Sequence, residues 1–118
     1  MPQDVSQNVA MQTCIDDCQE CWTLCTETVQ HCLQKGGRHA EADHIRLLLD
    51  CADICRTTAD FLLRGSDLFP QVCDMCAIVC ERCADSCDQL AEDSSMMDCA
   101  EVCRHCVDSC RQVAGTRV

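Results

Sequence analysis

Residues 73–87 read CDMCAIVCERCADSC, and their cysteines are separated by steps of 3, 4, 3 and 4 residues. An α-helix completes one turn every 3.6 residues, so these alternating steps keep all the thiols on one face. In a helical bundle, the same spacing marks the positions that face the partner helices. The stretch therefore predicts a bundle helix that carries a continuous row of thiols along its inner side.

The same spacing extends through the rest of the chain. Residues 14–32 hold five cysteines with steps of 4, 3, 4 and 7, and residues 99–110 hold four with steps of 4, 3 and 4. Between them, Cys51 and Cys55 are the only cysteines of the second segment, but Leu48, Thr58 and Leu62 continue their spacing. All 16 cysteines thus occupy positions where a bundle usually carries leucine. We expect the thiols to face one another along the bundle axis.

Turn signals divide the chain into four segments. We expect helices over residues 4–35, 39–64, 68–92 and 95–114, within a single domain over residues 1–118. Gly36-Gly37 and Gly65 are typical of helix ends, and Ser95 with Asp98 resembles a capping box. Such short linkers join antiparallel neighbours. The sequence therefore predicts an all-α fold, an antiparallel up-down-up-down four-helix bundle with a cysteine-lined core.

Composition excludes several classes of protein. Only 24 of the 118 residues are Ile, Leu, Val or Phe, which is few for a self-sufficient apolar core. The net charge of −11 opposes binding to phosphate backbones, so we expect no nucleic-acid partner. No run of about 18 apolar residues is present, so we expect no membrane-spanning segment. The sulfur atoms must serve a purpose beyond aliphatic burial.

The cysteines fit metal binding better than disulfides or simple packing. The polar, acidic start of the sequence, Met1-Pro2-Gln3-Asp4, carries no export signal, so we expect a cytoplasmic protein. A reducing cytosol keeps thiols free, and thiols one helical turn apart are too distant for an unstrained disulfide. A core packed with sixteen small cysteines alone would leave voids.

The metal that best fits this thiol column is Cu(I). It is soft, binds two or three thiolates and can share a bridging thiolate, and each Cu⁺ cancels one thiolate charge. Four tetrathiolate Zn²⁺ sites would instead bury about eight negative charges. A zinc or general thiolate-metal buffer, an iron–sulfur protein and a thiol redox protein remain alternatives. We expect no enzyme and no catalytic residue, because redox enzymes usually activate a single cysteine pair beside a cleft. The expected metal ligands are Cys14, Cys18, Cys21, Cys25, Cys32, Cys51, Cys55, Cys73, Cys76, Cys80, Cys83, Cys87, Cys99, Cys103, Cys106 and Cys110.

The pattern resembles the bacterial four-helix-bundle copper storage proteins, and specifically their cytosolic branch. The resemblance rests on the cysteine series at 14–25, 73–87 and 99–110 and on the stretch LDCADICR at 49–56, and it covers nearly the whole chain after about residue 10. It implies a homotetramer of bundles, each of which stores many Cu(I) ions without catalysis. It also implies that copper serves as a reserve or is sequestered against toxicity, and copper chaperones are candidate partners.

The two ends of the expected bundle differ in chemistry. Met11, Leu62 and Val113 would close one end with apolar side chains, whereas His44 and Met96 continue the cysteine row at the other. Imidazole and thioether are weaker Cu(I) ligands than thiolate, so we expect copper to pass in and out at the second end. His31 and His39 are expected nearby, as solvated groups at helix ends, and His105 is expected on the surface. With a small helix rotation or shift, His39 and His105 could also serve as end-site ligands.

Overall fold

The computed structural model describes residues 5–116, and within them every regular element is a helix. The long helices are α1 (Val5–Lys35), α2 (Ala42–Leu63), α3 (Phe69–Asp88) and α4 (Ser94–Ala114), and the short 3-10 helix η1 (Gly37–Ala40) precedes α2. The bundle measures 54 × 20 × 18 Å, and the 31 residues of α1 span ~46 Å of its length. The prediction of an all-α four-helix bundle is confirmed.

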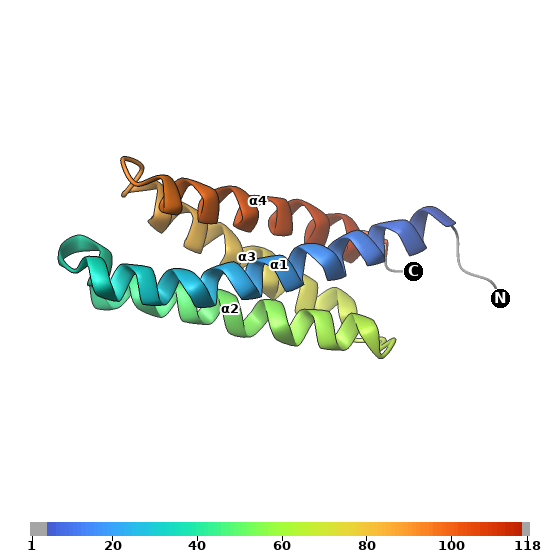
Figure 1. The fold of residues 1–118 in the computed structure, drawn as a ribbon. Coiled ribbons are helices and arrows are strands. Elements are labelled where there is room, and N and C mark those ends of the chain that lie inside the picture. Colours follow the sequence, from blue (N-terminus) through green and yellow to red (C-terminus); the bar gives the residue numbers. More distant parts are fainter. Residues whose placement is uncertain (1–4, 117–118) are drawn as a thin grey trace.

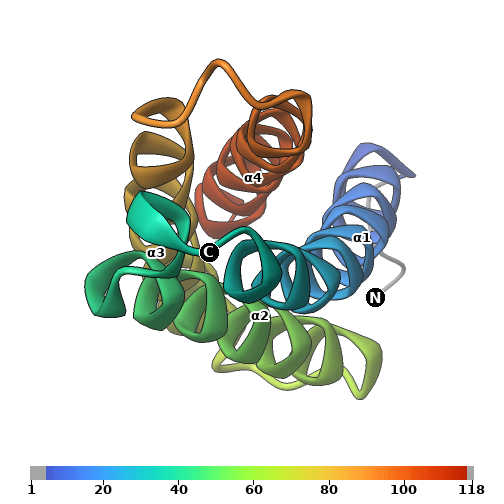
Figure 2. The same ribbon diagram turned by 60° about the vertical axis from the view of Figure 1, so that its left-hand side comes forward.

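The helices run alternately up and down, as their short connections require (Figure 1). In the described chain, α1 packs against α2 and α4, and α3 packs against the same two helices. Figure 2 shows the resulting square arrangement from nearer the bundle end. The α1–α2 and α3–α4 connections share one end of the bundle, and the α2–α3 connection lies at the other (Figure 1). The first end is called the His44 end below.

Local sequence explains most of the helix ends. Gly36 and Gly65 adopt φ values of 73° and 69°, a left-handed conformation that glycine accepts without a steric penalty, and they terminate α1 and α2. Pro70 lies in the first turn of α3, where a missing N–H costs no hydrogen bond.

The start of α2, the end of α3 and the N-cap of α4 differ from the sequence-based expectation. A 3-10 turn delays the start of α2 to Ala42. The helix α3 ends at Asp88. After it, the backbone N–H groups of Gln89 and Leu90 donate to the carbonyls three residues earlier, and this tighter turn buries Leu90. The N-cap of α4 is Asp93, whose side chain accepts a hydrogen bond from the Ser95 backbone N–H at 2.9 Å. The sequence indicated Ser95 as the cap, but the Asp93 carboxylate accepts the hydrogen bond of the Ser95 amide, so the helix begins one residue earlier, at Ser94.

The core is a column of sulfur with apolar side chains at its edges. All 16 cysteines have no exposed surface. Leu48, Thr58, Met96 and Val113 are the largest other side chains that are fully buried. Between the cysteine rows, buried alanines such as Ala77 and Ala84 let neighbouring helices approach closely. The thin aliphatic composition therefore reflects a core whose centre is made of thiols.

Candidate metal centre

The sixteen thiols form one connected column inside the bundle. All of them are free, and in twelve of them the sulfur atom lies 3.5–4.0 Å from another cysteine sulfur. Contacts cross between helices at every level: Cys14 meets Cys110 at 3.6 Å, and Cys21 meets Cys51 at 3.6 Å. The expectation that the cysteine rows face one another is met by all four helices. The periodicity of each helix is what directs its thiols inward.

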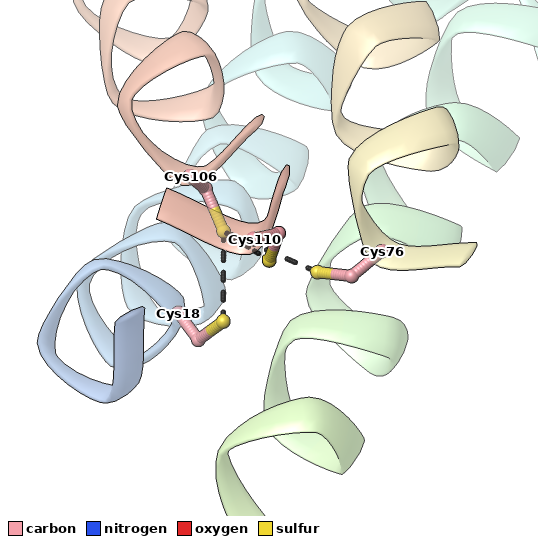
Figure 3. A group of neighbouring side chains, drawn as sticks. All are labelled: Cys18, Cys76, Cys106 and Cys110. Carbon is pink, nitrogen blue, oxygen red and sulfur yellow. Dashed lines mark hydrogen bonds between the residues drawn. The ribbon is translucent and has the colours of Figure 1, made fainter. Parts of the chain in front are cut away.

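Within this column the thiols gather into groups of three or four whose sulfur atoms all lie within 4.8 Å of one another. Figure 3 shows one such group, in which Cys18 of α1 and Cys76 of α3 converge on Cys106 and Cys110 of α4. In it, Cys106 lies 3.6 Å from Cys18 and 4.0 Å from Cys76. Ligands from three helices can therefore bind one ion without any backbone loop wrapped around it.

The groups share members, and this sharing is the most informative feature of the site. Cys106 belongs both to the group in Figure 3 and to a second group with Cys21, Cys55 and Cys80. Further groups include Cys21/Cys25/Cys51/Cys103, Cys25/Cys83/Cys99/Cys103 and Cys14/Cys73/Cys110. Isolated tetrahedral sites would need four ligands each and no overlap. Thiolates shared between adjacent sites instead suit ions that accept bridging sulfur.

The distances alone do not select the metal. A tetrahedral Zn²⁺ site with Zn–S bonds of about 2.3 Å has sulfur–sulfur edges of about 3.8 Å, which is within the range found here. The overlap of the thiol groups and the charge of the ion distinguish Cu(I) from Zn²⁺. A chain of bridging thiolates can be filled by singly charged Cu(I) with the core near neutrality, whereas Zn²⁺ bound to separate quartets leaves buried negative charge.

Contacts between thiols and burial shift the pKa values along the column in both directions, lowering that of Cys21 and raising those of Cys25 and Cys32. At the His44 end, desolvation raises the pKa of the Cys32 thiol to about 11. In mid-column, hydrogen bonds with Cys103 and other thiols, together with burial, raise the pKa of Cys25. These thiols therefore hold their protons at neutral pH until a metal displaces them.

One end of the column is chemically different from the rest. The Cys32 sulfur lies 3.5 Å from Nε2 of His44, and its thiol donates to the Met96 sulfur at 3.8 Å. The Nδ1 atom of His44 lies 2.7 Å from the Ser86 hydroxyl, which orients the ring. Desolvation lowers the pKa of His44, which favours the neutral, metal-binding imidazole. The structure thus brings His44 and Met96 to the terminal thiol, as the sequence spacing indicated.

The other histidines are placed differently. The expectation that His39 is solvated is wrong: it is 7% exposed, and its Nε2 lies 2.9 Å from Oδ2 of Asp93. His31, which is half-buried, places its own Nε2 2.8 Å from the same oxygen. The His105 side chain is exposed on α4, as expected. Within residues 8–116, no hydrogen bond joins these three histidines to a cysteine.

Sequence reasoning missed Asp93 and Ser86. Asp93 joins α1, η1 and the start of α4 through one carboxylate, which closes the His44 end. Its only sequence signal was the Asp-Ser-Ser break before α4, which resembled an ordinary cap. Ser86 lies on α3 beside the cysteine row, a position where a serine in the sequence does not indicate a functional role.

Comparison with known proteins decides the family. A family model described as "Copper storage protein" matches residues 7–115. This chain belongs to the copper storage protein family. The resemblance inferred from the cysteine spacing is confirmed.

Solved structures of similar sequence share the fold over nearly the whole chain. A protein from Nitrosospira multiformis is 43% identical over 92% of this chain and 97% of its own, with a TM-score of 0.86. A cytosolic copper storage protein from Streptomyces lividans, with five coppers, is 31% identical over 95% of this chain and 98% of its own, with a TM-score of 0.83. The uncharacterized cysteine-rich protein YhjQ of Bacillus subtilis is 31% identical over 62 residues, which cover 52% of this chain and 57% of that protein.

Proposed function

We propose that this protein stores Cu(I) in the cytoplasm, with its sixteen cysteines as the ligands. The observation that carries the proposal is the overlap of the thiol groups, in which Cys21, Cys25, Cys103 and Cys106 each belong to two quartets. Family membership and the copper-loaded Streptomyces relative support the same conclusion. No catalytic role is proposed, and no described helix is long and apolar enough to cross a membrane.

An anaerobic titration of the reduced protein with Cu(I), in competition with a chelator, tests this function. Bridging predicts close to one Cu(I) per thiol, so uptake continues to about 16 equivalents. Uptake of about four Zn²⁺ with weak copper binding would reject copper storage in favour of a zinc buffer. An iron–sulfur absorbance spectrum in the purified protein would reject both.

We further propose that copper passes in and out at the His44 end, with Cys32 as the first thiol it meets. The contacts of Cys32 with His44 and Met96 provide two weaker ligands beside the terminal thiol. A His44→Ala/Met96→Leu variant should load Cu(I) more slowly than the wild type, while Met97→Leu, a change at an exposed methionine, should not. Equal loading rates in the double variant and the wild type would reject this entrance. The proposal does not include His39, which contacts Asp93, or His105, which is exposed on α4.

We propose a homotetramer as the assembly. In the single bundle, several large apolar side chains are 47–60% exposed, among them Leu49, Leu63, Met75 and Ile78. Where such side chains form a contiguous patch, they mark a protein–protein contact. Light scattering coupled to gel filtration should give four times the chain mass of 13.1 kDa, and a monomer would reject the proposal.

A further inference from the structure

A cavity of about 410 Å³ opens beside His44, between η1, the start of α2 and the end of α3. Its lining includes His44, Ser86 and Leu90, together with charged residues at its rim. His44 is also the residue that contacts the terminal thiol, Cys32. Among the lining residues, His44 therefore connects the cavity directly with the thiol column. The size lies within the range of pockets that hold small molecules.

The charged residues that line this cavity differ in whether they form ion pairs. Arg38 donates from Nη2 to the Gln89 carbonyl at 3.0 Å, and among the side chains of residues 8–116 it has no carboxylate partner. Arg82 forms no ion pair within residues 8–116. Two acidic residues of the lining, by contrast, are already paired: Asp43 with Arg46, and Asp85 with Arg104. The cavity therefore offers two unpaired guanidinium groups in a protein whose net charge is −11.

Glu41 adds a third unpaired charge to the lining, of opposite sign. The complementary ligand carries two carboxylates and one ammonium group. Arginine binds carboxylates through parallel hydrogen bonds, which gives this recognition geometric specificity. Because Cu(I) is soft, a small molecule that carries it to His44 must hold it through sulfur.

We propose that this cavity binds a small thiol that bears carboxylates, such as a peptide thiol, and that this molecule delivers Cu(I) through His44 to Cys32. This inference rests on the proposed entrance at His44. Arg38 and Arg82 hold the carboxylates of the carrier, and Glu41 faces its ammonium group. The carrier's sulfur-bound copper then lies on the outer side of the imidazole.

The transfer is a ligand exchange with no change of oxidation state. The Cys32 sulfur forms a bond to copper as the bond between copper and the carrier sulfur breaks. The proton of the Cys32 thiol passes to the departing thiolate, and the carrier leaves as a free thiol. Nδ1 of His44 lies 2.7 Å from the Ser86 hydroxyl and Nε2 lies 3.5 Å from the Cys32 sulfur, so Nε2 is positioned to bind the passing ion.

The test compares two copper donors with the full-length protein. One donor is Cu(I) in excess glutathione, which has two carboxylates and one ammonium group, and the other is Cu(I) in excess 2-mercaptoethanol, which is uncharged. The Arg38→Gln/Arg82→Gln variant should lose at least about tenfold in loading rate from glutathione relative to 2-mercaptoethanol, as expected for the loss of two charge-assisted hydrogen bonds. The matched control, Arg56→Gln/Arg64→Gln, removes the same charge from two exposed positions, one on α2 and one just after it, and should keep the wild-type ratio.

A copper-free measurement separates binding from transfer. S-Methylglutathione, which has no free thiol, should bind the metal-free protein saturably in a calorimetric titration, and the Arg38→Gln/Arg82→Gln variant should not bind it. A donor ratio unchanged in that variant, or reduced equally in the control, would overturn the proposal. If His44→Ala loads normally from both donors while the arginine variant is impaired, the entrance through His44 fails but carrier binding stands.

Discussion

The carboxylate of Asp93 gives the sharpest test of how the His44 end is held together. Its Oδ1 caps α4, and its Oδ2 meets Nε2 of His31 and His39 at 2.8 and 2.9 Å. These hydrogen bonds lower the pKa of Asp93 from 3.8 to about 2, and the bond with His31 has the largest effect. At 1.36 kcal/mol per pKa unit, the ionised carboxylate stabilises the fold by about 2 kcal/mol. Its side chain is 8% exposed, so solvent screens little of this contribution.

Two substitutions divide this contribution. Asp93→Asn keeps a good N-cap but removes the charge, and should lower the free energy of unfolding by about 2 kcal/mol. Asp93→Ala also removes the cap and should cost about 1 kcal/mol more. The matched control, Glu92→Gln, removes the same charge from the adjacent exposed position and should have little effect.

Urea unfolding of the reduced, metal-free protein, followed by circular dichroism, measures these differences. Because the folded-state pKa lies below the unfolded-state value of 3.8, the contribution is complete above about pH 5 and is lost as pH falls through about 2. The gap between wild type and Asp93→Asn should therefore close over that range. A neutral-pH effect of Asp93→Asn no larger than that of Glu92→Gln would refute the reasoning.

Three further predictions concern the core. Leu48→Ala should lower the free energy of unfolding in urea by about 2–5 kcal/mol because Leu48 is fully buried, whereas Leu49→Ala, at a position that is 47% exposed, should lower it far less. Equal decreases in the two variants would contradict the assigned inner face of α2. Cu(I) affinity should fall as pH falls, by about tenfold per pH unit for each proton released, because copper displaces the proton of thiols such as Cys32, whose pKa is about 11. A chelator competition at two pH values, corrected for chelator protonation, checks this, and a pH-independent affinity would disprove it. Copper loading should raise the melting temperature, since saturation at 100 times the dissociation constant adds about 2.7 kcal/mol; an unchanged melt would contradict ligation in the folded core.

Much of the fold could be predicted because the helices report their inner faces directly in the sequence. The cysteine steps in residues 73–87 match one helical face, and Gly36 and Gly65 end their helices for steric reasons that are local. The end of α3 and the cap of α4 could not be placed in this way. Both depend on where Leu90 and Asp93 find partners on other elements.

By itself, the sequence determined that sixteen thiols point into a helical bundle, because helical periodicity assigns each residue to a face without knowledge of its neighbours. Only the tertiary structure decided which thiols share a group, since Cys21 meets Cys51 and Cys103 only at one rotation and axial offset of three helices. The same offsets draw His39 to Asp93, bring His44 to Cys32 and leave Arg38 and Arg82 unpaired beside a cavity. Spacing along one chain does not encode these offsets, because they arise from packing between helices.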